Sequence, residues 1–155
     1  MIHKVLFICH GNICRSTMAE MVFKHMVKQA HMEHLFLIDS MATSREELGN
    51  PVHPGTRRKL AQVGIPCSDH RATQITKKDY DRFDYLIVMD HNNIRNLMRI
   101  IGEDPEQKVS MLLDYAGREG QSIADPWYTG NFDLTYDDVY EGCKGLLDYL
   151  KQNVL

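Results

Sequence analysis

The sequence predicts an α/β fold, in which helices cover both faces of a doubly wound, four-stranded parallel sheet in three layers with strand order 2-1-3-4. Short apolar runs without alternation recur along the chain, as expected for parallel strands that are buried on both faces. Segments with apolar residues at helical spacing separate these runs. No repeat, low-complexity stretch or linker interrupts the pattern, so residues 1–155 are expected to form a single domain.

The first half of the chain is predicted to hold two strands and two helices. The strand His3–Ile8 precedes a helix in which apolar residues recur over positions 19–30. A second strand, Leu35–Ile38, is expected to end at Asp39–Ser40, where a loop begins. A proline and a glycine mark the two ends of the second helix, Pro54–Gly64.

The second half of the chain is predicted to complete the sheet. A brief helix starts near Thr76, and the strand Tyr85–Met89 follows. Asp90 caps the next helix, which Gly102 closes, and the strand Val109–Leu113 comes after it. A long loop over 114–133 then leads to an amphipathic helix from Val139 to Leu150.

Composition and charge exclude several classes of function. Of the 155 residues, 43% are hydrophobic and 25% are charged, and a net charge of −3 gives no electrostatic basis for binding nucleic acid or an anionic membrane. No apolar run approaches the roughly 20 residues that span a bilayer, and the start of the chain does not resemble a signal peptide.

The four cysteines lack zinc spacing and the density of a disulfide scaffold, and the eight histidines form no ligand pair. We therefore expect a cytoplasmic monomer or weak homodimer without metal or cofactor.

The loop after the first strand carries the main chemical signal. The strand ends at Cys9, and Gly11, Arg15 and Ser16 follow before the helical pattern starts. Backbone amides in such a loop, together with the N-terminus of the next helix, favour a bound anion. The same positive surroundings favour the thiolate of a cysteine. A cysteine alone is more often buried and inert, but the planar fork of Arg15 suits two phosphate oxygens and makes Cys9 a candidate nucleophile.

A second loop offers the acid that a phosphate ester needs for its leaving group. The sequence Asp125-Pro126-Trp127-Tyr128 lies in the long loop, which is predicted to leave from the same edge of the sheet as the cysteine loop. Proline biases Asp125 towards an extended backbone, and the aromatic residues could wall a slot for an aryl ring. Taken alone, an Asp-Pro pair usually marks a turn.

These motifs resemble those of the low-molecular-weight protein tyrosine phosphatases, and the resemblance extends along the whole chain. It implies hydrolysis of phosphotyrosine in proteins, or of small aryl phosphates, through a cysteinyl-phosphate and without metal. The residues that carry the resemblance are Cys9, Gly11, Asn12, Cys14, Arg15, Ser16 and the pair Asp125-Pro126.

The resemblance implies a role for each of these positions. Cys9 attacks phosphorus, while Arg15 and the loop amides hold the phosphate oxygens. Asp125 protonates the leaving phenol and then activates water, and the hydroxyl of Ser16 stabilises the Cys9 thiolate. Cys14 has two implied readings, as a residue that fills space behind the loop or as the partner of Cys9 in a reversible disulfide.

Asn12 and two further residues are expected to support the loop by hydrogen bonds. The resemblance assigns this role to Asn12, Ser40 and His70, although Ser40 and His70 could instead be ordinary surface polar residues.

The walls of the pocket depart from the family pattern. Trp127 and Tyr128 are expected to flank the substrate ring, with Ile13 on the floor side. Many relatives place a tryptophan where this chain has Glu46-Glu47, and His10 replaces a residue that is commonly apolar. We therefore expect intact catalysis with altered specificity, and the two glutamates should disfavour acidic phosphopeptides.

Three alternatives use a similar fold or loop. An arsenate reductase needs a relay of further cysteines, but none lies between Cys67 and Cys143. A phosphoarginine phosphatase tends to have threonine at the position of Ile13, where an apolar residue favours a phenyl ring. A non-catalytic phosphate-binding module would not need Cys9, Arg15 and Asp125 together.

Overall fold

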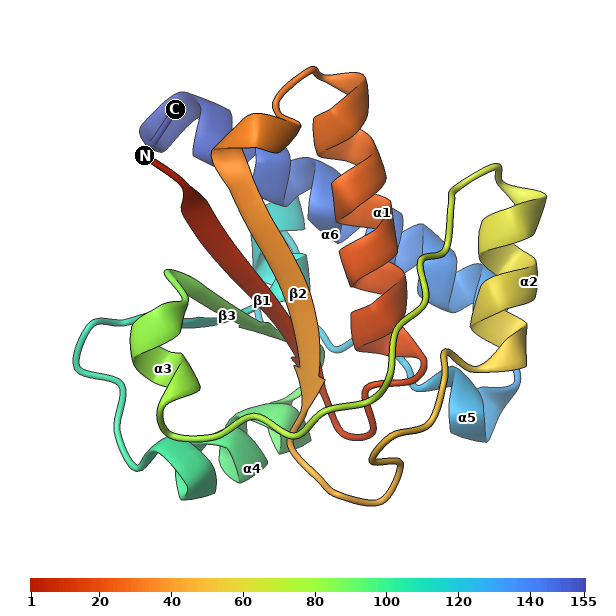
Figure 1. The fold of residues 1–155 in the computed structure, drawn as a ribbon, viewed down its shortest axis with the longest axis horizontal. Coiled ribbons are helices and arrows are strands. Elements are labelled where there is room, and N and C mark those ends of the chain that lie inside the picture. Colours follow the sequence, from red (N-terminus) through yellow and green to blue (C-terminus); the bar gives the residue numbers. More distant parts are fainter.

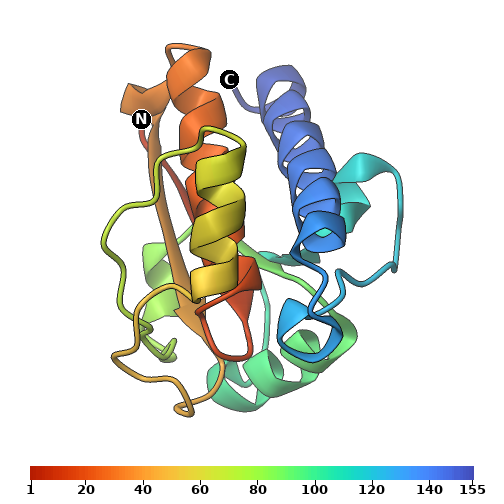
Figure 2. The ribbon, with the colours of Figure 1, turned by 90° about the vertical axis from the view of Figure 1, so that its right-hand side faces the viewer.

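The computed structural model describes all 155 residues and contains one parallel four-stranded sheet in the order β2-β1-β3-β4 (Figure 1). This order confirms the predicted topology. Helices lie on both faces of the sheet, so the three-layer arrangement is also confirmed (Figure 2). The strands are β1 (His3–Cys9), β2 (Phe36–Ala42), β3 (Tyr85–Val88) and β4 (Val109–Met111).

The helices divide between the two faces of the sheet (Figures 1 and 2). One face carries α1 (Arg15–Gln29), α2 (Pro54–Gln62) and α6 (Phe132–Asn153), and the other carries α3 (Asp79–Arg82) and α4 (His91–Ile101). Three short elements complete the fold, namely η1 (Glu33–Leu35), η2 (Leu112–Ala116) and α5 (Pro126–Thr129).

The central strand β1 separates two apolar clusters. Val5 and Phe7 pack into the cluster under α1 and α6, while Leu6 and Ile8 pack into the cluster under α4. This division follows from the alternation of side chains along a strand. All four side chains are fully buried because helices cover both faces of the sheet, which explains why the sequence shows no alternation here.

The second strand runs further than the sequence predicts. It continues through Asp39–Ser40 to Ala42, because the parallel register pairs Leu6 with Asp39 and Cys9 with Ala42. Backbone pairing with the central strand thus outweighs the turn preference of the polar residues. Ser40 lies inside β2 and is buried, not in a loop.

Two boundaries in the second half also differ from the predicted ones. The fourth strand stops at Met111, and Asp114 turns the chain into η2 by accepting a hydrogen bond from the Met111 amide. The final helix starts at Phe132, since the side chain of Asn131 accepts a hydrogen bond from the amide of Leu134 and caps it. The predicted loop over 114–133 therefore contains helical turns, including α5.

The carboxyl ends of the strands bring three connections together at one edge, at the bottom of Figure 1. These are the β1–α1 loop, the β2–α2 connection and the segment around α5. Both chain termini lie at the opposite end of the molecule (Figure 1). No helix combines the length and apolar character needed to cross a bilayer.

Candidate active site

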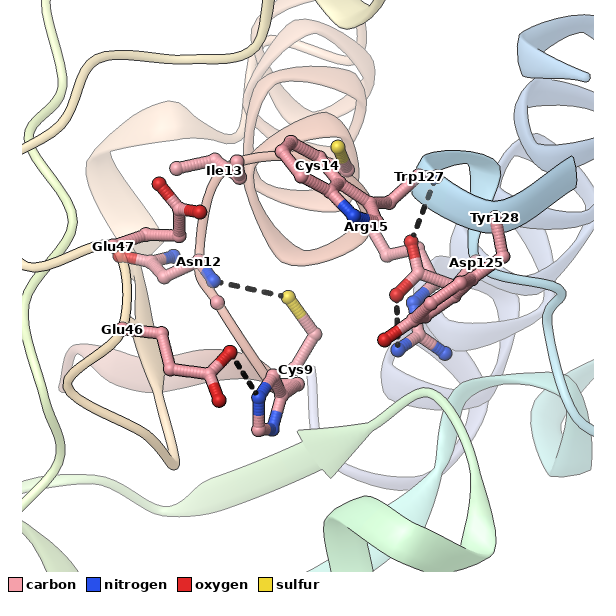
Figure 3. A pocket seen from close by; sticks show the side chains of 12 residues that line it. Cys9, Asn12, Ile13, Cys14, Arg15, Glu46, Glu47, Asp125, Trp127 and Tyr128 are labelled. Carbon is pink, nitrogen blue, oxygen red and sulfur yellow. Dashed lines mark hydrogen bonds and ion pairs between the residues drawn. The ribbon is translucent and has the colours of Figure 1, made fainter. Parts of the chain in front are cut away.

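The loop between β1 and α1 curves around the Cys9 sulfur and forms a cradle (Figure 3). Cys9 is the last residue of β1, and the chain then turns through Asn12, which has a φ of 61°. No side chain caps α1, whose first residue is Arg15. Because the first amides of a helix have no partner within the helix, this end favours an anion.

The sulfur of Cys9 lies among hydrogen-bond donors. The Asn12 amide is 3.3 Å from Sγ, and the Ser16 hydroxyl is 3.0 Å away. Ser16 Oγ also accepts a hydrogen bond of 2.8 Å from Asn12 Nδ2, which leaves its own hydrogen free for the sulfur. The Asn12 amide and the Ser16 hydroxyl can therefore both donate to the sulfur.

Arg15 is held in place by three acceptors from two segments. Its Nη1 donates to Asp90 Oδ2 at 2.6 Å and to the carbonyl of Ile123 at 2.9 Å. Its Nη2 lies 3.5 Å from Asp125 Oδ2. Burial alone would lower the pKa of Arg15, but the Cys9 thiolate and the two carboxylates outweigh burial and raise that pKa. The guanidinium is therefore charged and fixed beside the cradle.

Asp90 was expected only to cap α4, and it does so by accepting a hydrogen bond from the Asn93 amide. Its second oxygen binds Arg15. The predicted strand order held a signal for this contact, since β3 is next to β1 and Asp90 follows β3 at the same edge as the cysteine loop.

The side chain of Asn12 is completely buried and uses all of its hydrogen-bonding groups. Its Nδ2 donates to Ser16 and, at 3.0 Å, to Ser40 Oγ. Its Oδ1 accepts from His70 Nε2 at 2.8 Å and from the Thr73 amide at 3.2 Å. Ser40 and His70 are thus brought behind the loop, where both contact Asn12.

Sequence reasoning missed Glu20, which completes this network from α1. Glu20 Oε1 accepts from Ser40 Oγ at 2.5 Å and lies 3.5 Å from His70 Nδ1, and Oε2 pairs with Lys24. Glu20, Asp39 and His70 have potential metal-ligating atoms within 4.8 Å of one another. The bonds from Ser40 and Lys24 already use both Glu20 oxygens, which fits support of the loop better than a metal site. An acidic residue within the apolar stripe of the predicted helix was the available signal.

Asp125 faces the cradle from the other side (Figure 3). It caps the short helix α5 with an extended backbone at φ −81° and ψ 114°, as the following proline predicts. Its Oδ1 accepts from the Trp127 amide at 3.0 Å, and its Oδ2 points to Arg15.

A pocket of about 90 Å³ lies between two walls above the cradle. Figure 3 shows the glutamates on one side and the segment around Asp125 on the other. The predicted loop-support residues Ser40 and His70 lie behind the loop, not in the pocket. The lining residues are Cys9, His10, Gly11, Asn12, Ile13, Cys14, Arg15, Glu46, Glu47, Asp125, Trp127 and Tyr128.

The mouth of the pocket is polar on the glutamate side. His10 Nε2 lies 2.9 Å from Glu46 Oε2, and Glu47 Oε2 accepts from Asn50 Nδ2 at 2.6 Å. On the opposite side the aromatic residues are open to solvent, with Trp127 55% exposed and Tyr128 83% exposed.

The second cysteine of the loop is a buried, free thiol. Burial first, and then the charges of Cys9 and Asp125, raise the pKa of Cys14 to about 12. Cys14 therefore keeps its proton at neutral pH and is a poor nucleophile there. Its disulfide with Cys9 stays a prediction.

Comparison with known proteins agrees with this geometry. Residues 4–155 match the family model described as low molecular weight phosphotyrosine protein phosphatase. Low molecular weight protein-tyrosine-phosphatase YfkJ of Bacillus subtilis is 38% identical over 144 residues, which cover 92% of each chain. The human low molecular weight phosphotyrosine protein phosphatase is 40% identical over 141 residues, which cover 90% of this chain and 87% of the relative.

The fold also agrees with that of solved structures of this family. The crystal structure of YfkJ from Bacillus subtilis superimposes with a TM-score of 0.95 at 35% identity, covering 100% of this chain and 98% of that chain. From the match over nearly all of its length, the chain belongs to the low molecular weight phosphotyrosine protein phosphatase family.

Proposed function

We propose that this chain hydrolyses phosphotyrosine in proteins, and small aryl phosphate monoesters, through a cysteinyl-phosphate on Cys9. One observation carries the proposal. The Cys9 sulfur and the Asp125 carboxyl line the same pocket, which also contains the buried guanidinium of Arg15. Nucleophile, oxyanion cradle and proton donor are the three groups that cleavage of a phosphate ester requires.

In the first step the Cys9 thiolate attacks phosphorus. The S–P bond forms as the bond between phosphorus and the phenolic oxygen breaks. Asp125, in its protonated form, gives its proton to the departing oxygen, and the phenol leaves. Arg15 and the free amides at the start of α1 stabilise the charge on the three equatorial oxygens.

In the second step water hydrolyses the intermediate. Asp125, now a carboxylate, takes one proton from the water molecule while the water oxygen attacks phosphorus. The S–P bond breaks, phosphate leaves, and the sulfur returns to the thiolate that Asn12 and Ser16 stabilise. Asp125 is again protonated, so the cycle needs no metal or other cofactor.

The pocket favours an aryl phosphate over phosphoarginine or arsenate. Ile13 and Trp127 both line the pocket with apolar surface, and a phenyl ring fits such a surface better than a guanidinium does. Arsenate reduction would need a further accessible cysteine, but the only cysteine in the second half of the chain, Cys143, is fully buried in α6.

A thiolate nucleophile requires a reducing compartment, and we therefore place the chain in the cytoplasm.

The assignment of nucleophile and acid is tested by two substitutions. The wild type should hydrolyse p-nitrophenyl phosphate and phosphotyrosine in the presence of EDTA. Cys9→Ser should abolish this turnover. Asp125→Asn should lower kcat/KM for phenyl phosphate about a hundredfold or more, the range that a general acid contributes. It should affect p-nitrophenyl phosphate much less, because nitrophenolate leaves without a proton.

The comparison of the two substrates provides the control for these variants. Equal losses on both substrates in Asp125→Asn would contradict the acid role, and turnover by Cys9→Ser would contradict the nucleophile.

Support of the loop by Asn12 is tested by comparing Asn12→Gly with Asn12→Ala. Both remove the buried side-chain hydrogen bonds and should lower kcat/KM for p-nitrophenyl phosphate. Urea unfolding should find the alanine variant less stable than the glycine variant by about 1 kcal/mol, because only glycine adopts a positive φ without strain. Wild-type kcat/KM in Asn12→Gly would show that the loop needs only the backbone turn.

The acidic mouth should select against acidic peptides. In the double variant Glu46→Gln/Glu47→Gln, kcat/KM for a phosphotyrosine peptide with acidic flanks should rise about two- to fivefold, as expected for charges at the protein surface. The gain should shrink at high salt, and a peptide with lysine flanks should lose activity. Glu103→Gln, at an exposed acid outside the pocket, is the matched control. An unchanged ratio between the two peptides would exclude a role of the glutamates in specificity.

A further inference from the structure

A histidine at the start of α2 connects the two loops of the site. The His53 amide donates to the carbonyl of Ile13 in the phosphate loop at 2.9 Å. Its Nδ1 accepts from the Gly55 amide at 2.9 Å and caps α2. Capping side chains are usually Ser, Thr, Asp or Asn, so the cap alone does not explain an imidazole here.

The ring of His53 lies within an aromatic group that ends at the acid loop. It stacks on Phe132 with a centroid distance of 5.3 Å and an angle of 23°. It meets Trp127 edge to face, at 5.6 Å and 78°. Gly55 makes room for this group, since a Cβ at this position would lie 2.3 Å from the Phe132 ring. The group therefore joins the starts of α2 and α6 to Trp127.

Trp127 in turn bears directly on Asp125. Its amide donates to Asp125 Oδ1, so movement of Trp127 moves the carboxyl group. The helix α5 that holds both residues has four residues, and the Trp127 side chain is 55% exposed. A single helical turn is not stable by itself, so contacts of its side chains, such as that of Trp127 with His53, help to set the position of Asp125.

We propose that His53 is a positioning residue, whose ring holds Trp127 and thereby aligns the Asp125 carboxyl with the phosphate loop. The fixed cap orients the ring, and the bond to Ile13 ties the ring to the same loop that carries Cys9. The inference rests on the proposed role of Asp125 as general acid. In this arrangement the His53 ring sets the distance between the phosphate loop and the Asp125 carboxyl.

Two substitutions separate the ring from the cap. His53→Asn keeps a side-chain acceptor for the Gly55 amide and removes the ring. His53→Phe keeps an aromatic ring next to Trp127 and removes the acceptor. If His53 only capped α2, the phenylalanine variant would be the more damaged enzyme.

The leaving-group dependence of kcat/KM is the first measurement. In His53→Asn, kcat/KM for phenyl phosphate should fall about tenfold, since a small misplacement of a catalytic group costs up to about a hundredfold. The value for p-nitrophenyl phosphate should change little. His53→Phe should keep the wild-type ratio between the two substrates, with a lower Tm from the lost cap.

The fluorescence of Trp127, the only tryptophan in the chain, is the second measurement and does not depend on activity. In His53→Asn its emission should shift to longer wavelength, and acrylamide should quench it more strongly, because the indole loses its aromatic neighbour. In His53→Phe both signals should stay close to those of the wild type.

The outcomes distinguish the inference from the function on which it rests. If Asp125→Asn alters the ratio between the two substrates and His53→Asn does not, the positioning role is overturned. If Asp125→Asn leaves that ratio unchanged, the acid role itself fails. Should His53→Asn not fold, Trp127→Leu breaks the same contact from the other side, and a wild-type ratio in that variant would overturn the inference.

Discussion

The site depends on the left-handed turn at Asn12 and on the hydrogen bonds of its buried side chain. A non-glycine residue with a φ of 61° is strained unless its surroundings hold it. Here Ser16, Ser40, His70 and the Thr73 amide satisfy every polar group of the Asn12 side chain. The turn aims the Asn12 amide at the Cys9 sulfur and sets the start of α1, which leaves amides free for an anion.

Arg15 is likewise held in the site by its hydrogen-bond partners. A buried guanidinium is costly without partners, and Asp90 and Asp125 supply them. The two contacts are unequal, at 2.6 Å for Asp90 and 3.5 Å for Asp125. The first fixes the orientation of the fork, and the second is the longer contact. In the mechanism we propose, a phosphate oxygen takes the place of Asp125 beside Nη2, and Asp125 turns towards the leaving group.

The sequence predicts the features that depend on local pattern. Unbroken apolar runs indicated the buried parallel strands, and the Asp90 and Gly102 signals marked both ends of α4. The parallel strand order predicts that Cys9 and Asp125 lie at the same edge of the sheet. Prediction failed where pairing between distant segments decides the result. Ser40 continues β2 because β1 pairs with it, although local preference favours a loop.

The contacts missed by sequence reasoning are all made through space between residues far apart in the chain. The position of Glu20 in the apolar stripe of its helix does not reveal its partners Ser40 and His70, and the sequence around His53 does not reveal the contacts of its ring with Phe132 and Trp127. Each of these contacts forms only when three or more segments of the chain come together. Such residues support the chemistry without carrying a motif of their own.

Trapping the covalent intermediate tests the central claim most directly. The enzyme would be mixed rapidly with a phosphate ester, quenched within one turnover, digested and analysed by mass spectrometry. The mechanism predicts a phosphoryl group on Cys9 in a stoichiometry approaching one per chain, with none on Cys14, whose buried thiol keeps its proton. A phosphoryl group on another residue, or turnover without any labelled Cys9, would contradict the account.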